Sequence, residues 1–98
     1  MQLPIIGSTT VDLDPGKYET LKVGKTAVTS KPITAGLVFI VATTNVIVDA
    51  GAEPDADAQG GVIPAGAGTA VWLTNPLTDY VSVRTVDGSE GLVTLYHL

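Results

Sequence analysis

The stretch LVFIVATTNVIVD, residues 37–49, decides the fold of this chain. It holds two short apolar runs rich in β-branched residues, which favour strands over helices. The first run, residues 37–42, shows no alternation of apolar and polar residues, as is typical of a central strand covered on both faces. Thr43, Thr44 and Asn45 separate it from the second run, residues 46–49, as in a hairpin.

The same kind of pattern recurs on both sides of this stretch, and no segment has the apolar spacing of a helix. Turn signals such as Asp14-Pro15-Gly16, Asn75-Pro76 and Asp87-Gly88 separate the apolar runs. Further strands are predicted at residues 17–23, 26–30, 69–74, 80–86 and 92–97, and residues 62–63 could add a short one. Seven to eight short antiparallel strands predict an all-β fold, either a small β-sandwich or a jelly-roll-like barrel.

The last two predicted strands are expected to form a hairpin. Residues 80–86 place Val81 and Val83 on one face, and residues 92–97 place Val93 and Leu95 on one face. A loop with an odd number of residues pairs Val83 with Val93 or with Leu95, which keeps apolar side chains opposite each other.

The chain of 98 residues is predicted to be one β domain with an arm at residues 1–10. Leu3, Ile5 and Ile6 are the apolar residues of this arm, and Pro4 and Gly7 prevent a long central strand there. The arm could add to the sheet edge of a neighbour or dock on a lattice, so these three residues are candidate interaction residues.

Trp72 is the fourth candidate interaction residue and the single Trp of the chain. It sits inside an apolar run, so we expect it in the core. The alternative is an exposed position at an interface or as a platform for a sugar.

Residues 49–68 form a long loop rich in Ala, Gly, Pro and acidic residues. A loop of this length is either functional or mobile, and a solvated excursion between strands is expected. Its spacing imitates the start of a calcium-binding loop, although Gly66 stands where a bidentate Glu is required. The clustered oxygens leave a candidate Ca²⁺ site, against a plain charge cluster, at Asp49, Glu53, Asp55 and Asp57.

The composition disfavours several function classes. A net charge of −5 with five basic residues argues against nucleic-acid binding and against anionic membranes. Without Cys there is no disulfide or thiolate chemistry, and the single His97 lies next to the last residue, a poor place for a catalytic base. The N-terminal residues show no secretory signal and no run is long enough to span a membrane. We therefore expect a non-enzymatic protein that needs no cofactor and folds in a cytoplasm.

Residues 36–98 resemble small virion structural proteins of tailed bacteriophages, of the type encoded near the major capsid protein. The resemblance lies in the order of the parts, which are a buried strand at 36–41, a second strand at 46–49, an Ala/Asp/Pro loop, the turn VIPAG at 62–66, a strand with a central Trp at 71–73, and a last hairpin that begins at 79. It implies a decoration or cement protein on the capsid surface of a virion, bound to the major capsid protein or another virion protein, often as a trimer. The alternative is a carbohydrate- or receptor-binding β-module.

Self-association is expected from the residues as well. Charged residues make up 15% of the chain, so a large neutral surface must exist. An apolar strand also runs to the last residue, and a free edge there would have to be paired or covered.

Overall fold

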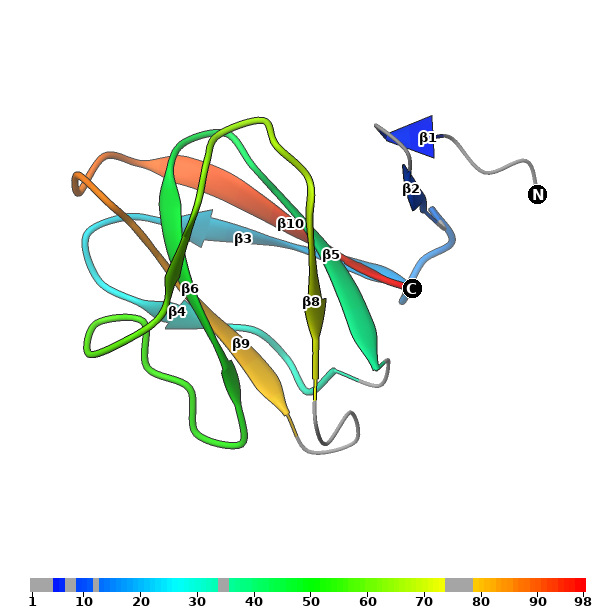
Figure 1. The fold of residues 1–98 in the computed structure, drawn as a ribbon, viewed down its shortest axis with the longest axis horizontal. Helices are drawn as coiled ribbons and strands as arrows, with labels where there is room; N and C mark the ends of the chain where they lie inside the picture. Colours follow the sequence, from blue (N-terminus) through cyan, green and yellow to red (C-terminus); the bar gives the residue numbers. More distant parts are fainter. Residues whose placement is uncertain (1–4, 7–8, 12, 34–35, 74–78) are drawn as a thin grey trace.

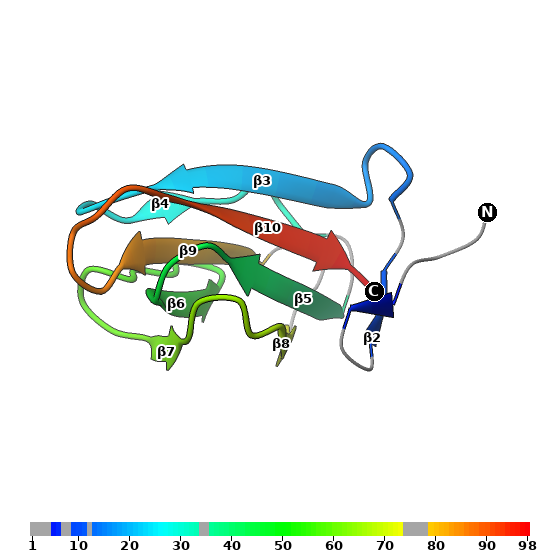
Figure 2. The same ribbon diagram turned by 90° about the horizontal axis from the view of Figure 1, so that it is seen from above.

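The computed structural model describes residues 5–6, 9–11, 13–33, 36–73 and 79–98. Two four-stranded antiparallel sheets pack face to face (Figures 1 and 2). The β10 sheet, named after a central strand, has the order β3 (Tyr18–Val23), β10 (Gly91–His97), β5 (Leu37–Ala42) and β8 (Thr69–Trp72). The β9 sheet has the order β4 (Val28–Thr29), β9 (Tyr80–Thr85), β6 (Val46–Gly51) and β7 (Gly61–Ile63). The all-β sandwich of short antiparallel strands is therefore confirmed.

The eight strands of the two sheets coincide with the predicted strand positions, and the short addition at 62–63 is part of β7. Two parts of the predicted long loop at 49–68, residues 49–51 at its start and residues 61–63 within it, belong to β6 and β7. β5 lies inside its sheet between β10 and β8, and Val38, Phe39 and Ile40 are buried in succession. The central position of residues 37–42 in a sheet is thus confirmed, but of the outward-facing side chains only Phe39 is buried, whereas Leu37 and Val41 are half-buried.

The expected hairpin of the last two strands is wrong. β9 and β10 belong to opposite sheets, so Val83 pairs with Val28 and Val48, whereas Val93 pairs with Leu21 and Ala42. Both strands still bury their apolar faces, because they point them at each other across the sandwich instead of pairing side by side.

The connection at Thr43-Thr44-Asn45 is also not a hairpin, because β5 and β6 lie in different sheets. Each end of the connection continues the ladder of its own sheet. The Thr43 amide donates to the Leu92 carbonyl over 3.0 Å, and the Val86 amide donates to the Asn45 carbonyl over 3.0 Å. Backbone groups that a tight turn would pair with each other are therefore satisfied by two different sheets.

The core lies between the two inner faces and is almost wholly aliphatic. Alternation along each strand sends every second side chain inward. The buried cluster consists of Val23, Ile33, Val38, Ile40, Ala42, Val46, Val48, Ile63, Leu73, Val81, Val83, Val93 and Leu95. Thr85 is buried beside it, and its hydroxyl donates to the Gly24 carbonyl over 3.0 Å.

The two long sides of the sandwich differ. On the side of β3 and β4, the Thr85 amide also donates to the Gly24 carbonyl, over 2.9 Å, which links the two sheets. β7 and β8 lie on the opposite side (Figure 2). A groove of about 330 Å³ runs between them, with Val48, Ala50, Ile63, Thr69 and Val71 among its lining residues.

A separate pair of short strands, β1 (Ile5–Ile6) and β2 (Thr9–Thr10), lies outside both sheets, near the C-terminal end of β10 (Figures 1 and 2). In the part of the chain that the structure describes, these two strands pair only with each other. No helix within the described ranges is long and apolar enough to cross a membrane.

Candidate functional site

The outer face of the β9 sheet is covered by the chain's own loop, residues 52–60. The Ala56 amide donates to the Ser82 hydroxyl over 3.0 Å, and Arg84 Nε donates to the Ala56 carbonyl over 2.9 Å. Ala56 and Ser82 are both about 1% exposed. The loop therefore differs from the expected solvated excursion, because its centre is docked on β9 while most of its other residues remain exposed.

The acidic residues of this segment fasten the loop. Asp49 Oδ2 accepts hydrogen bonds from the Asp55 amide (2.9 Å) and from Gln59 Nε2 (3.0 Å). The bond from the Asp55 amide, supported by that from Gln59, lowers the pKa of Asp49. Asp57 Oδ1 accepts from the Ala27 amide over 3.1 Å and lies 3.7 Å from Arg84 Nε.

The structure does not bring the four candidate calcium ligands together. No group of three or more acidic or His side chains that could hold a metal ion exists among the described residues, which include Asp49, Glu53, Asp55 and Asp57. The carboxylates of Asp49, Asp55 and Asp57 accept hydrogen bonds from the loop and its neighbours.

Several large side chains on the outer face of the β10 sheet are exposed, and we call this surface the exposed β10 face. Strand register places one set of side chains on it, with Tyr18 opposite Tyr96 and Leu92 opposite Lys22. The rings of Tyr18 and Tyr96 lie 6.2 Å apart, centroid to centroid, at 38°. The full set is Tyr18, Thr20, Lys22, Leu37, Phe39, Val41, Ala70, Trp72, Leu92, Thr94 and Tyr96.

Large apolar side chains dominate this face. Trp72 is 77% exposed, Leu92 45% and Tyr18 42%. Lys22 is the single charged residue in the set. Such a composition, aromatic and poor in charge, is typical of the centre of a protein interface rather than of free surface.

The expectation of Trp72 in the core is wrong. β8 alternates, so Val71 packs against the core and Trp72 points outward. Phe39 shares the face with Trp72 but is buried, because its ring occupies the space where a Cβ on Gly68 would lie. The parity of Val71 within the run Ala70-Val71-Trp72-Leu73 was the available signal, and the apolar character of the whole run obscured it.

The other candidate interaction residues lie in the N-terminal arm. Leu3 falls outside the described residues. Ile5 and Ile6 form β1, where Ile5 pairs with Thr10 and Ile6 with Thr9. The structure therefore does not bring this segment and Trp72 into one described site.

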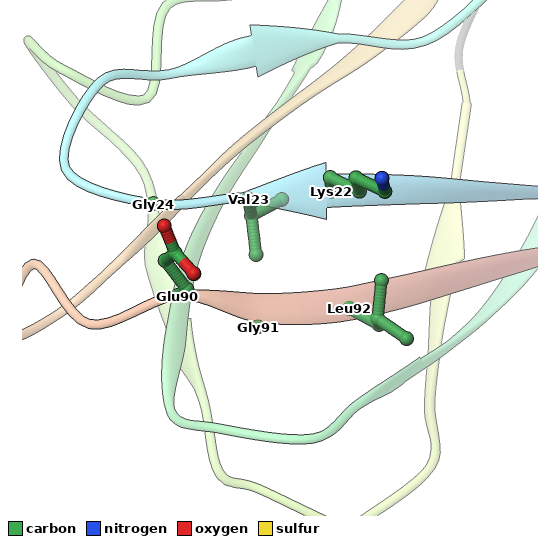
Figure 3. A pocket seen from close by; sticks show the side chains of 6 residues that line it. All are labelled: Lys22, Val23, Gly24, Glu90, Gly91 and Leu92. Atoms are coloured by element: carbon green, nitrogen blue, oxygen red, sulfur yellow. The ribbon is translucent and has the colours of Figure 1, made fainter.

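A recess of about 560 Å³ lies at one end of the exposed β10 face (Figure 3). Lys22 and Leu92 belong to both the face and the recess, and Glu90 adds a carboxylate beside Gly24 and Gly91. The lining thus offers one ammonium group and one carboxylate but no hydroxyl, thiol or imidazole. Such a recess can accept a protruding side chain or loop of a partner.

His97 lies on the inner face of β10, the same face as Val93 and Leu95. Both ring nitrogens are buried and have no hydrogen-bond partner among the described residues. Burial lowers the pKa of His97, and the nearby charges of Glu19 and Lys17 act in opposite directions. The half-buried ring of His97 is therefore part of the end of the sandwich, where an ordinary polar position was expected.

Comparison of the chain with protein-family models, with curated proteins and with solved structures finds no match. The features of the chain that bear on function are the contrast between the two outer faces and the order of sequence parts in residues 36–98.

Proposed function

We propose that this chain is a non-enzymatic structural protein of a tailed-bacteriophage virion that binds a capsid lattice and reinforces it. The observation that carries the proposal is the exposed β10 face, on which Trp72, Leu92 and Tyr18 are exposed and Lys22 is the single charged residue. The resemblance of residues 36–98 to virion decoration proteins supports the choice of a capsid surface, with the major capsid protein or another virion protein as the partner.

The physical basis of docking is burial of this apolar face. Burial of apolar surface contributes about 25 cal/mol per Å², and aromatic side chains bury about 150–250 Å² each. A few such side chains at the centre of an interface commonly supply most of its binding energy. A sheet face with exposed Tyr, Trp and Leu side chains suits a lattice, where the same contact is repeated many times.

The test is to add the purified protein back to capsids from virions that lack its gene, and to measure occupancy by sedimentation. Leu92→Glu places a charge in the exposed β10 face and should weaken binding at least about tenfold, which corresponds to about 1.4 kcal/mol. Val62→Glu is the matched control, since Val62 is 65% exposed on the opposite sheet. No binding of the wild-type protein, or equal loss in both variants, would overturn the proposal.

A carbohydrate-binding module is the second candidate, and the exposure of Trp72 favours it specifically. A sugar stacked on Trp72 would change the tryptophan fluorescence, and the signal is unambiguous because the chain has one Trp. Titration with a panel of oligosaccharides distinguishes the two functions. A saturable emission change would favour the sugar-binding module, and its absence would favour the lattice.

A further inference from the structure

β8 is an edge strand without the usual protection against pairing. Among the described strands it pairs only with β5. Edge strands are normally blunted by charges, Pro residues or extreme shortness. β3 carries charged residues, β4 has two residues and β7 has three. By contrast, the sequence from Gly60 to Leu73 has no charged residue, and β8 itself has no Pro.

The register shows which backbone groups of β8 are free. The Leu73 amide donates to the Gly36 carbonyl over 2.8 Å, which marks a hydrogen-bonded pair at the end of the β5–β8 ladder. Such pairs alternate along antiparallel strands, so Thr69 and Val71 also bond to β5. Ala70 and Trp72 therefore direct their amides and carbonyls away from β5, toward the free edge.

We propose that two copies of this chain associate through antiparallel pairing of β8 with β8 about a twofold axis. One register uses both free residues of each strand, and it places Ala70 opposite Trp72 of the second copy. Val71 then lies opposite Val71 of the second copy, on the axis, where it borders the groove between β7 and β8. The small Ala70 side chain leaves room for the indole of the opposite Trp72, and the absence of charge avoids repulsion across the axis.

This pairing joins the two β10 sheets into one continuous sheet of eight strands. Residues opposite each other on antiparallel strands project to the same side, so the two exposed β10 faces become one larger face. The pairing does not depend on the proposed lattice function, because it involves only the edge of β8. Four-residue edges bury less than a standard interface, so we expect a dissociation constant on the order of micromolar.

Sedimentation over micromolar to millimolar concentrations measures this equilibrium, and a dimer of two 10.0 kDa chains is expected. Ala70→Pro removes a free amide but no bond to β5, so association should weaken at least about tenfold while the melting temperature stays close to that of the wild type. Trp72→Lys places a charge on the edge at an exposed position and should have the same effect. The double variant Ala70→Glu/Trp72→Lys should regain association, because the register places each Lys opposite a Glu.

A disulfide tests the axis directly, since the chain contains no Cys. Residues that face each other in a non-hydrogen-bonded pair have Cα atoms about 4.5 Å apart, within disulfide range. Val71→Cys should therefore oxidise to a covalent dimer, whereas Val62→Cys on β7 should remain monomeric under the same conditions. A monomeric mass at every concentration, a trimeric mass, or equal cross-linking of both variants would overturn the proposal.

Discussion

Removal of one hydroxyl should release the loop that covers the β9 sheet. Ser82 is 1% exposed, and its Oγ accepts the hydrogen bond of the Ala56 amide at 3.0 Å. Ser82→Ala leaves that amide buried without a partner, which costs about 1–3 kcal/mol. For a domain of this size, roughly 4–8 °C of melting temperature corresponds to each kcal/mol, so a fall of about 5–20 °C is expected if the loop stays docked.

The loop can also respond by detaching, which sets an upper limit on the loss of stability. If residues 52–60 detach locally, the Ala56 amide regains water, and the loss cannot exceed the free energy that holds the loop on β9. The bonds from Arg84 to Ala56 and from Ala27 to Asp57 oppose detachment. A small fall in melting temperature should therefore be accompanied by faster hydrogen exchange at the Ala56 amide.

Thermal unfolding and amide exchange measured on the same samples separate these responses. Thr29→Ala is the matched control, because Thr29 is the exposed residue paired with Ser82 on β4 and its substitution also removes one hydroxyl. The control should change the melting temperature by no more than a few degrees. A Ser82→Ala protein with wild-type melting temperature and wild-type exchange at Ala56 would refute the anchoring role of this bond.

Two further outcomes are expected, one from the close approach of Gly68 to Phe39 and one from the half-buried His97. Gly68→Ala should lower the free energy of unfolding by about 1–3 kcal/mol, because the new Cβ would lie 1.9 Å from Phe39 Cζ. Gly61→Ala is the control and should change the free energy of unfolding little, because no atom lies within 4 Å of its new Cβ. Urea denaturation of both variants measures the difference. The lowered pKa of His97 means that the unfolded state takes up the proton more readily, so stability should be full above about pH 6.5 and should fall as the pH drops below it. Urea midpoints between about pH 8 and 5 measure this, and a His97→Phe protein should lose most of the pH dependence in that range.

Local pattern predicted the strands well because β-branched runs and turn residues act over a few neighbouring residues. Pairing between strands could not be predicted in the same way. Val83 and Val93 satisfy the same rule, an apolar side chain directed at an apolar surface, whether their strands pair side by side or face each other across the sandwich. The alternation of a single strand cannot distinguish these arrangements.

The candidate site was harder to predict for a related reason. Trp72 stands in an uninterrupted apolar run, which does not reveal that Val71 packs against the core and that Trp72 lies on the outer face. The exposed β10 face is likewise assembled from four strands that are distant in sequence, none of which looks like a binding motif alone. Ser82 and Ala56, which close the opposite face, were missed because small residues give no hydrophobic signal.

Charged side chains are distributed unequally between the outer face of the β9 sheet and the exposed β10 face. Acidic side chains gather on the side of the β9 sheet, where Asp49, Asp55 and Asp57 fasten the covering loop, whereas the exposed β10 face carries Lys22 alone. Two copies that approach through their loop sides meet like charges, which raises the free energy of such encounters. The β10 sheet meets no such barrier and offers apolar area as well as a free edge. In the proposed contacts, with a lattice or with a second copy, this charge distribution would favour the β10 sheet over the loop side.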